Sequence, residues 1–127
     1  MIKKFINIII FITCIFIYSC SKEVSQDLQY DEKPEVLYKV AKEHLNKSDY
    51  ENAAFYFEKL IKKFPLSNEG IQSQIMLAFI DYMKMDYQNA IYNSNLLINK
   101  YPSYKDIEYV HYLKALCYYE QIRNEQL

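Results

Sequence analysis

Two stretches of this sequence repeat one another at a fixed distance of 37 residues. The segment SDYENAAFYFEKLIKKFP begins at Ser48, and MDYQNAIYNSNLLINKYP begins at Met85 with the same order of residue types. So many matches at one spacing indicate a true internal repeat, and periods of about 20–50 residues are typical of stacked repeat folds. The matching pairs include Asp49 and Asp86, Tyr50 and Tyr87, Asn52 and Asn89, Ala53 and Ala90, Leu60 and Leu97, Lys63 and Lys100, and Pro65 and Pro102.

The spacing of apolar residues within the repeat predicts α-helices. Apolar side chains recur every three or four residues from Leu37 to Phe64, which is the period of one face of a helix. Pro65 and Pro102 close the two copies, because proline cannot continue a helix. We expect helices near residues 34–47, 50–64, 68–84, 87–101 and 104–123, which make two helical hairpins and the first helix of a third.

Polar residues at the predicted helix ends support these boundaries. Asp86, and either Asp49 or Ser48, can cap the second helix of a hairpin, and Ser48 and Glu51 have the spacing of a capping box. Basic residues in the last turns complement the carbonyl ends of the same helices, at Lys62, Lys63 and Lys100.

The hairpins resemble the tetratricopeptide repeat, in which small residues let two helices approach closely before a closing proline. Ala41, Ala78 and Ala115 recur at the 37-residue step, and each is expected to face Ala53 or Ala90. The copies depart from that repeat in their period, which is commonly about 34 residues, in lacking tryptophan, and in replacing the aromatic Phe57 by Ser94. The resemblance implies an all-α, right-handed α-solenoid of about two and a half repeats, near residues 34–66, 71–103 and 104–127.

The first residues form a segment of a different kind. Lys3 and Lys4 precede an apolar run from Phe5 to Ile17. That run has the length of a signal peptide and is shorter than the roughly 20 residues that cross a bilayer. The sequence therefore predicts a signal peptide over residues 1–19, with an uncleaved signal anchor as the alternative.

The signal peptide ends in IYSC, residues 17–20, which resembles the lipobox of bacterial lipoproteins. Tyr18 departs from the small or aliphatic residue usual at its position. We expect Cys20 to be acylated and to become the mature N-terminus, followed by a flexible tether over residues 20–33. Lipid chains on one residue hold a protein to a membrane surface without spanning it.

Composition argues against several classes of function. The net charge of −1 gives no general attraction to nucleic acid. Gly70 is the only glycine, so a glycine-rich phosphate loop is excluded. His44 and His111 lie on different hairpins, and Cys117 reads as a small core residue. We expect neither enzymatic activity nor a cofactor nor a metal site.

Two longer stretches carry a more specific resemblance. Residues 35–77 contain a Tyr-x-x-Ala helix, its paired helix and a Phe-Pro turn before a Gln-rich helix start. Residues 99–116 contain a proline, a short loop and the string EYVHYLKA from Glu108 to Ala115. Together with the lipobox, these features resemble the BamD family of outer-membrane assembly lipoproteins, from the signal peptide to about residue 122. Members of that family are longer, so we expect either the N-terminal portion of a longer protein or a natural short form.

This resemblance implies a lipid-anchored protein of the outer membrane that faces the periplasm. The implied partners are a BamA-type β-barrel insertase, its accessory lipoproteins and unfolded β-barrel precursor segments. A repeat lipoprotein that scaffolds envelope or pilus assembly, without recognising precursors, is the alternative.

In repeats of this type the first helices line the concave surface, where an extended peptide with aromatic anchors is expected to bind. Packing between repeats is the alternative role for any one of these side chains. The positions expected on that surface are Tyr38, Lys42, Gln72, Ile75, Phe79, Tyr82, Tyr109, Tyr112 and Tyr119.

Overall fold

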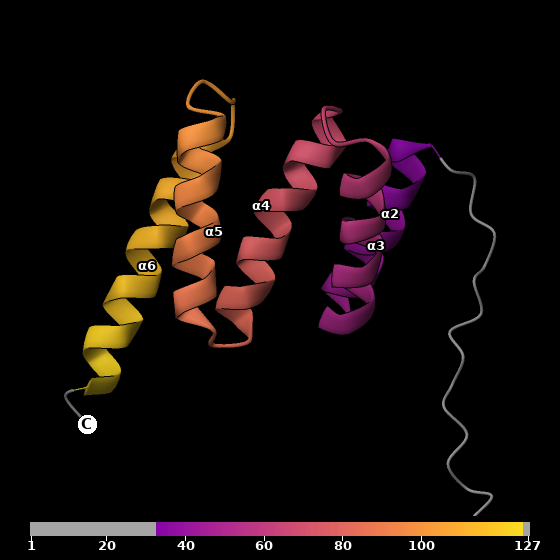
Figure 1. Cartoon of the computed structure of the whole chain (residues 1–127). Helices are drawn as coiled ribbons and strands as arrows, with labels where there is room; N and C mark the ends of the chain where they lie inside the picture. Colours follow the sequence, from indigo (N-terminus) through magenta and orange to yellow (C-terminus); the bar gives the residue numbers. More distant parts are fainter. Residues whose placement is uncertain (1–32, 126–127) are drawn as a thin grey trace, which may run out of the picture.

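The computed structural model describes residues 33–125, with side chains as far as Arg123. The predicted signal peptide, Cys20 and nearly all of the predicted tether lie outside the described residues. The five helices confirm an all-α fold, and the described part contains no strand (Figure 1). No helix among these residues is long and apolar enough to cross a bilayer. The helices are α2 (Pro34–Asn46), α3 (Tyr50–Lys63), α4 (Asn68–Met83), α5 (Tyr87–Lys100) and α6 (Ile107–Glu125).

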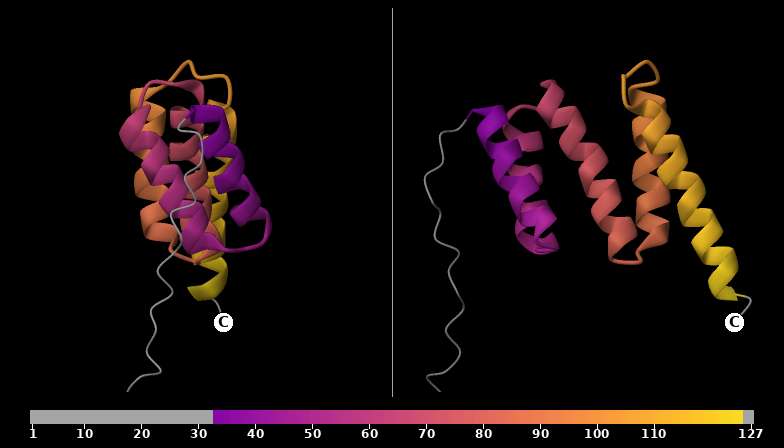
Figure 2. Two further views of the ribbon diagram at one scale, coloured as in Figure 1. Left: turned by 90° about the vertical axis from the view of Figure 1, so that its right-hand side faces the viewer. Right: turned by 180° about the vertical axis from the view of Figure 1, so that it is seen from behind.

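The helices form two layers. Each helix packs against the next one in the chain, and α4 also contacts both α2 and α6, whereas α3 and α5 do not touch. Helices α2, α4 and α6 therefore make one side of the molecule, which we call the first-helix face. Helices α3 and α5 make the other, the second-helix face (Figures 1 and 2). This alternation is the arrangement of stacked helical hairpins.

The second helices of the two hairpins begin and end at equivalent residues, 37 positions apart. Asp49 accepts a hydrogen bond from the backbone N–H of Asn52, and Asp86 accepts the same bond from Asn89. The side-chain amides of these asparagines also donate to the aspartates, at 2.8 and 2.7 Å. Both predicted aspartate caps are therefore confirmed.

The capping role considered for Ser48 was wrong. Ser48 has a φ of 58°, in the left-handed region, and its hairpin partner by position, Met85, has a φ of 63°. Both residues form the tight turn that precedes the cap, so Ser48 and Glu51 do not make a capping box. The repeat thus preserves a backbone conformation even where the residue type changes from Ser to Met.

One of the two later first helices begins at another residue than expected. Helix α6 begins at Ile107 and not near 104, because residues 101–107 form successive turns in which Tyr104 N–H donates to Tyr101 O and Ile107 N–H to Tyr104 O, both at 3.0 Å. Helix α4 begins at Asn68, as expected, and the Ser67 hydroxyl caps it by accepting from Gly70 N–H at 2.9 Å.

The core has a first cluster under α2, α3 and α4 and a second cluster between α4, α5 and α6. Phe57, Leu37 and Leu60 are fully buried in the first, and Val110 and Leu113 in the second. The two clusters meet at α4, where both include partly buried Met76 and Phe79.

The recurring alanines behave differently in the last helix. Ala41, Ala53, Ala78 and Ala90 are fully buried, as close packing within each hairpin requires. Ala115 is exposed, contrary to the expectation that it faces another alanine. The structure describes no further helix beside α6, so this position has no neighbour to pack against.

Only glycine fits at residue 70, because another part of the backbone approaches it closely. It is buried in the first turn of α4, and a Cβ atom at this position would lie 2.0 Å from the carbonyl oxygen of Phe64. Ser67 Oγ donates to that same oxygen at 3.0 Å and accepts from Gly70 N–H. Any side chain at residue 70 would therefore open the turn that joins the two hairpins.

We expect Gly70→Ala to destabilise the fold by about 1–3 kcal/mol, because the steric conflict outweighs the gain in helix propensity. The measurement is thermal unfolding of the detergent-solubilised full chain, followed by circular dichroism at 222 nm. Gln88→Ala, at an exposed position of α5, is the control and should melt like the wild type. A Gly70→Ala melting temperature at or above that of the wild type would contradict the close approach.

Candidate functional site

A hollow of about 340 Å³ lies on the first-helix face, between α4 and the start of α6. Gln72, Ile75 and Met76 from α4, Tyr109 from α6 and Asp106 from the preceding turn line it. The aliphatic and thioether side chains give it an apolar base, and the amide, carboxylate and phenol are its polar groups. An apolar hollow with a few convergent polar groups has the composition of a ligand-binding site.

Hydrogen bonds hold the edge of this hollow. Gln72 Nε2 donates to Asp106 Oδ2 at 2.8 Å, which joins α4 to the turn before α6. Close by, the Tyr104 hydroxyl donates to Asn68 Oδ1 at 2.7 Å and makes a second link between the same two segments. The hollow is therefore bounded by fixed side chains, as a preformed site requires.

Tyr38 of α2 lies toward the same edge. Burial raises the pKa of its phenol, and nearby Tyr104, Asp106 and Glu69 raise this pKa further. These neighbours belong to the start of α4 and to the turn before α6, so Tyr38 faces the hydrogen-bonded edge. Its ring also packs on Phe57 at a centroid distance of 5.7 Å, so part of Tyr38 serves the core.

Aromatic residues gather along the first-helix face beside the hollow. Burial raises the pKa of Tyr109, and neighbouring Tyr112 and Tyr82 raise it further. The rings of Phe79 and Tyr82 lie 6.4 Å apart. Tyr109 is 37% exposed and Tyr112 is 62% exposed, so this group of rings is accessible from solvent.

The predicted surface residues differ widely in burial. Gln72, Ile75 and Tyr109 line the hollow, whereas Lys42 and Tyr119 are not among its lining residues. Ile75 is a core residue, Tyr38, Lys42, Gln72, Phe79 and Tyr82 are half-buried, and Tyr109, Tyr112 and Tyr119 are exposed.

The repeat explains part of this difference. Tyr38, Ile75 and Tyr112 occupy one repeat position, and Ile75 is 3% exposed because it packs in the second core cluster with residues of α6. Tyr119 shares a position with Tyr82, which is half-buried between core residues. Tyr112 and Tyr119 thus stand at positions that earlier hairpins use for packing. They are exposed because no described helix covers this side of α6, whereas Tyr109 is the exposed tyrosine that belongs to the hollow itself.

Neither a metal-binding group nor a reactive cysteine is found among the described residues. Residues 33–125 contain no group of His, Cys, Asp and Glu side chains placed to hold a metal ion. Cys117 is fully buried in a small cluster with Ala90 and Ile91, and burial raises the pKa of its thiol. A buried cysteine with a raised pKa behaves as a core residue and not as a nucleophile.

Comparison with known proteins agrees with this arrangement. A family model named YfiO and described as an outer membrane lipoprotein matches residues 30–126, which include every described helix. The chain belongs to this outer-membrane lipoprotein family. It is also 30% identical over 96 residues to the outer membrane protein assembly factor BamD of Caulobacter vibrioides. That match covers 75% of this chain and 32% of the relative, so the chain spans about a third of the relative's length.

Family membership confirms the resemblance seen in the sequence, but the sequence did not indicate two residues of the hollow, Met76 and Asp106. Met76 follows Gln72 by four residues, so the two share one side of α4 and helical spacing alone could have found it. Asp106 comes from an irregular turn, and only its hydrogen bond to Gln72 places it at the hollow.

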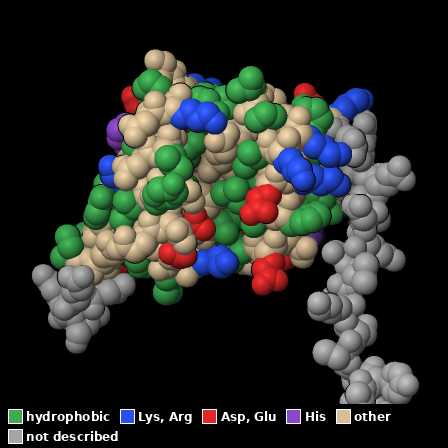
Figure 3. All heavy atoms as spheres, viewed as in Figure 1, with side chains coloured by type: hydrophobic (Ala, Val, Ile, Leu, Met, Phe, Trp, Pro, Cys, Tyr) green, Lys and Arg blue, Asp and Glu red, His purple; other side chains and the backbone are tan. Residues whose placement is uncertain are grey.

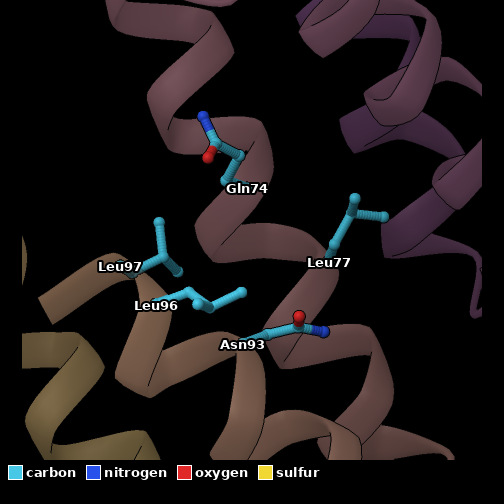
Figure 4. Close-up of a pocket in the computed structure, with 5 residues that line it drawn as sticks. All are labelled: Gln74, Leu77, Asn93, Leu96 and Leu97. Carbon is cyan, nitrogen blue, oxygen red and sulfur yellow. The ribbon is translucent and has the colours of Figure 1, made fainter. Parts of the chain in front are cut away.

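A second, smaller hollow of about 120 Å³ lies on the second-helix face. On this face hydrophobic side chains are dispersed among charged and polar ones (Figure 3). Figure 4 shows the hollow between α4 and α5, with Gln74 and Leu77 on one side and Asn93, Leu96 and Leu97 on the other. This region of α4 is open because α3 and α5 do not contact each other.

Asn93 also makes a contact that the sequence did not predict. Its Nδ2 donates to Oδ2 of half-buried Asp81 at 2.8 Å, across the second hairpin. Burial raises the pKa of Asp81 despite this hydrogen bond. In the first hairpin the same two positions hold His44 and Tyr56, whose rings stack at 5.5 Å. The same two repeat positions are therefore joined by ring stacking in the first hairpin and by a hydrogen bond in the second.

The raised pKa of Asp81 predicts a pH effect on stability. An unfolded aspartate has a pKa of about 3.9, so between that value and the higher folded pKa the folded chain binds the extra proton. Stability from this group is then lost as the pH rises through that window. We expect acidification from about pH 7 to about pH 4.5 to raise the wild-type melting temperature relative to Asp81→Asn, as measured by circular dichroism.

Asn93→Ala provides the matched test of the hydrogen bond. It removes the donor that favours the charged carboxylate, so the melting temperature of this variant should depend more steeply on pH than that of the wild type. Parallel pH profiles for wild type, Asp81→Asn and Asn93→Ala would show that Asp81 is not perturbed in solution.

Proposed function

We propose that this chain is a periplasm-facing lipoprotein that takes part in the assembly of outer-membrane β-barrels. Acyl chains on Cys20 hold it to the outer membrane. Membership of an outer membrane lipoprotein family supports the location. The relative named as an assembly factor supports the process. The proposed partners are a BamA-type insertase, its accessory lipoproteins and unfolded β-barrel precursor segments. No catalytic activity is part of this role.

The hollow between α4 and α6 is the observation that supports the proposed ligand. Its apolar base accepts one side chain, Tyr109 supplies an aromatic wall, and Gln72 and Asp106 offer polar atoms at the edge. An extended precursor segment presents alternate side chains to one face and leaves its backbone groups unpaired. Such a segment can place an aromatic anchor in the hollow and satisfy backbone groups at its edge.

We expect Tyr109→Ala to weaken the binding of such a segment about tenfold or more, because a truncated aromatic anchor loses most of its contact area. The probe is a fluorescent peptide of about ten residues, the length of a barrel strand, with alternating apolar residues and a C-terminal phenylalanine. Binding to the detergent-solubilised full chain is measured by fluorescence anisotropy.

Tyr92→Ala is the matched control, since Tyr92 is a 61% exposed tyrosine on α5, on the opposite face. Circular dichroism shows whether each variant keeps its helical content. Equal peptide affinities for wild type, Tyr109→Ala and Tyr92→Ala would remove the hollow as the binding site.

The exposed face of α6 supports a second candidate function, that of a scaffold. Tyr112, Tyr119 and Ile122 are each about 60% exposed, at 62%, 61% and 59%, and lie on one helix. Exposed apolar side chains gathered in one place favour protein–protein contact. A scaffold would bind a protein partner through α6 and would not bind the peptide. Co-purification with a BamA-type insertase from solubilised membranes would instead favour the assembly role.

A further inference from the structure

The first described residue and both turns between hairpins lie at one end of the molecule. Because the helices alternate in direction, the starts of α2, α4 and α6 lie at the same end as the last residues of α3 and α5 (Figure 1). We call this the entry end, and it comprises residues 33–36, 62–69 and 100–108. The opposite end comprises residues 43–51, 83–88 and 119–123.

The entry end is the more basic of the two. Its exposed acids are Glu35 and Glu108, while its other carboxylates, Glu69 and Asp106, are half-buried. At the opposite end the exposed charges balance, with Lys47, Lys84 and Arg123 against Glu43, Glu51 and Asp86. The exposed basic side chains of the entry end are Lys33, Lys62, Lys63, Lys100 and Lys105.

Lysines cluster visibly at this end of α3 in the space-filling view (Figure 3). Lys62 and Lys63 close α3, and Lys100 closes α5 at the equivalent repeat position of Lys63. Lysine side chains can extend an apolar stem along a surface and keep the ammonium group in water. They are therefore suited to a plane of anionic groups, which they meet as separate point charges.

An exposed leucine projects from the same end. Leu66, in the turn between α3 and α4, is 81% exposed, the highest value among the exposed large hydrophobic residues. Pro65 precedes it, and Pro102 occupies the equivalent position in the turn between α5 and α6; both are exposed. No core packing accounts for Leu66, since it belongs to none of the described clusters.

We propose that the entry end rests on the anionic phospholipid surface of the membrane that holds the chain. The five lysines lie at the level of the headgroup phosphates, and Leu66 enters the boundary between headgroups and acyl chains. Charge complementarity selects anionic lipid, and the exposed leucine selects a bilayer over a soluble phosphate. Basic side chains combined with an inserted apolar residue are the usual composition of a peripheral membrane contact.

The route of the chain favours this contact, in an argument that rests on the proposed acylation of Cys20. Lys33, where the described chain begins at the entry end, is the thirteenth residue after Cys20. Thirteen residues reach at most about 45 Å when fully extended. An anchor on this length of chain keeps the entry end at high effective concentration next to the bilayer.

Hydrogen–deuterium exchange of the full chain in lipid vesicles tests the proposal. The vesicles contain phosphatidylcholine alone or a mixture with phosphatidylglycerol. We expect the phosphatidylglycerol mixture to slow amide exchange in residues 64–69 and 100–106, and to leave residues 46–49 and 83–88 unchanged. Added salt should remove the protection, because exposed charges are screened.

Two matched double substitutions identify the charges. Lys62→Gln with Lys105→Gln should reduce the protection about 25-fold, since each lysine near an anionic surface contributes roughly fivefold. Lys47→Gln with Lys84→Gln, at the opposite end, should leave it unchanged. Leu66→Ser should also weaken protection, and all these side chains are exposed, so helical content should be retained.

Equal protection at both ends, equal protection in the two lipid mixtures, or none at the entry end would overturn the proposal. The mass of the N-terminal peptide from the same samples shows separately whether Cys20 carries acyl chains. A chain held by an uncleaved anchor would still report docking of the entry end. Failure of the acylation and failure of the docking are therefore read independently.

Discussion

A helical hairpin cannot bury its own apolar stripe, and this constraint explains most of the structure. Helix α4 meets it by packing on both neighbouring pairs: Ile80 belongs to the first core cluster, Ile75 and Ala78 to the second, and Phe79 contacts both. Helix α4 is therefore apolar on more than one side, and no single hairpin is a complete unit. In such stacks the stability is close to a sum of nearest-neighbour interfaces. Helix α6, which has neighbours on one side only among the described helices, accordingly leaves aromatic side chains and Ala115 exposed.

Stacking also decides where a binding surface can arise. Repeat positions that face the next helix must hold packing residues, as Ile75 and Ala78 do. Positions at the edge between successive first helices have no such requirement, and there the residue type varies freely. Gln72 and Tyr109 occupy one such position, where the first hairpin has Glu35. The hollow on the first-helix face lies at this edge, so its chemistry can change without loss of the fold. A repeat protein acquires specificity at the positions that its core does not use.

The sequence predicted the helices and the two aspartate caps well because those features depend on local period and on residues close in the chain. The predictions failed where the outcome depended on a neighbour in space. The exposure of Ala115 depends on whether a helix covers it, and the burial of Ile75 depends on α6. The pairing of Asp81 with Asn93 could not be read from a repeat whose first copy stacks rings at the same place. Asp106 lies in an irregular turn, and a single hydrogen bond from Gln72 places it at the hollow.

The proposed ligand surface and the proposed lipid surface lie close together. Gln72 is four residues into α4 from Asn68, about 6 Å along the helix axis, and Asp106 belongs to the turn at the entry end itself. If the entry end rests on the bilayer, the hollow opens within about two helical turns of the headgroups. In the proposed role, a precursor segment held there would lie beside the membrane. Its apolar side chains would then be exposed to water over only a short distance between the hollow and the bilayer. This is a physical reason for the proposed recognition surface to lie at this end of the solenoid and not at the other.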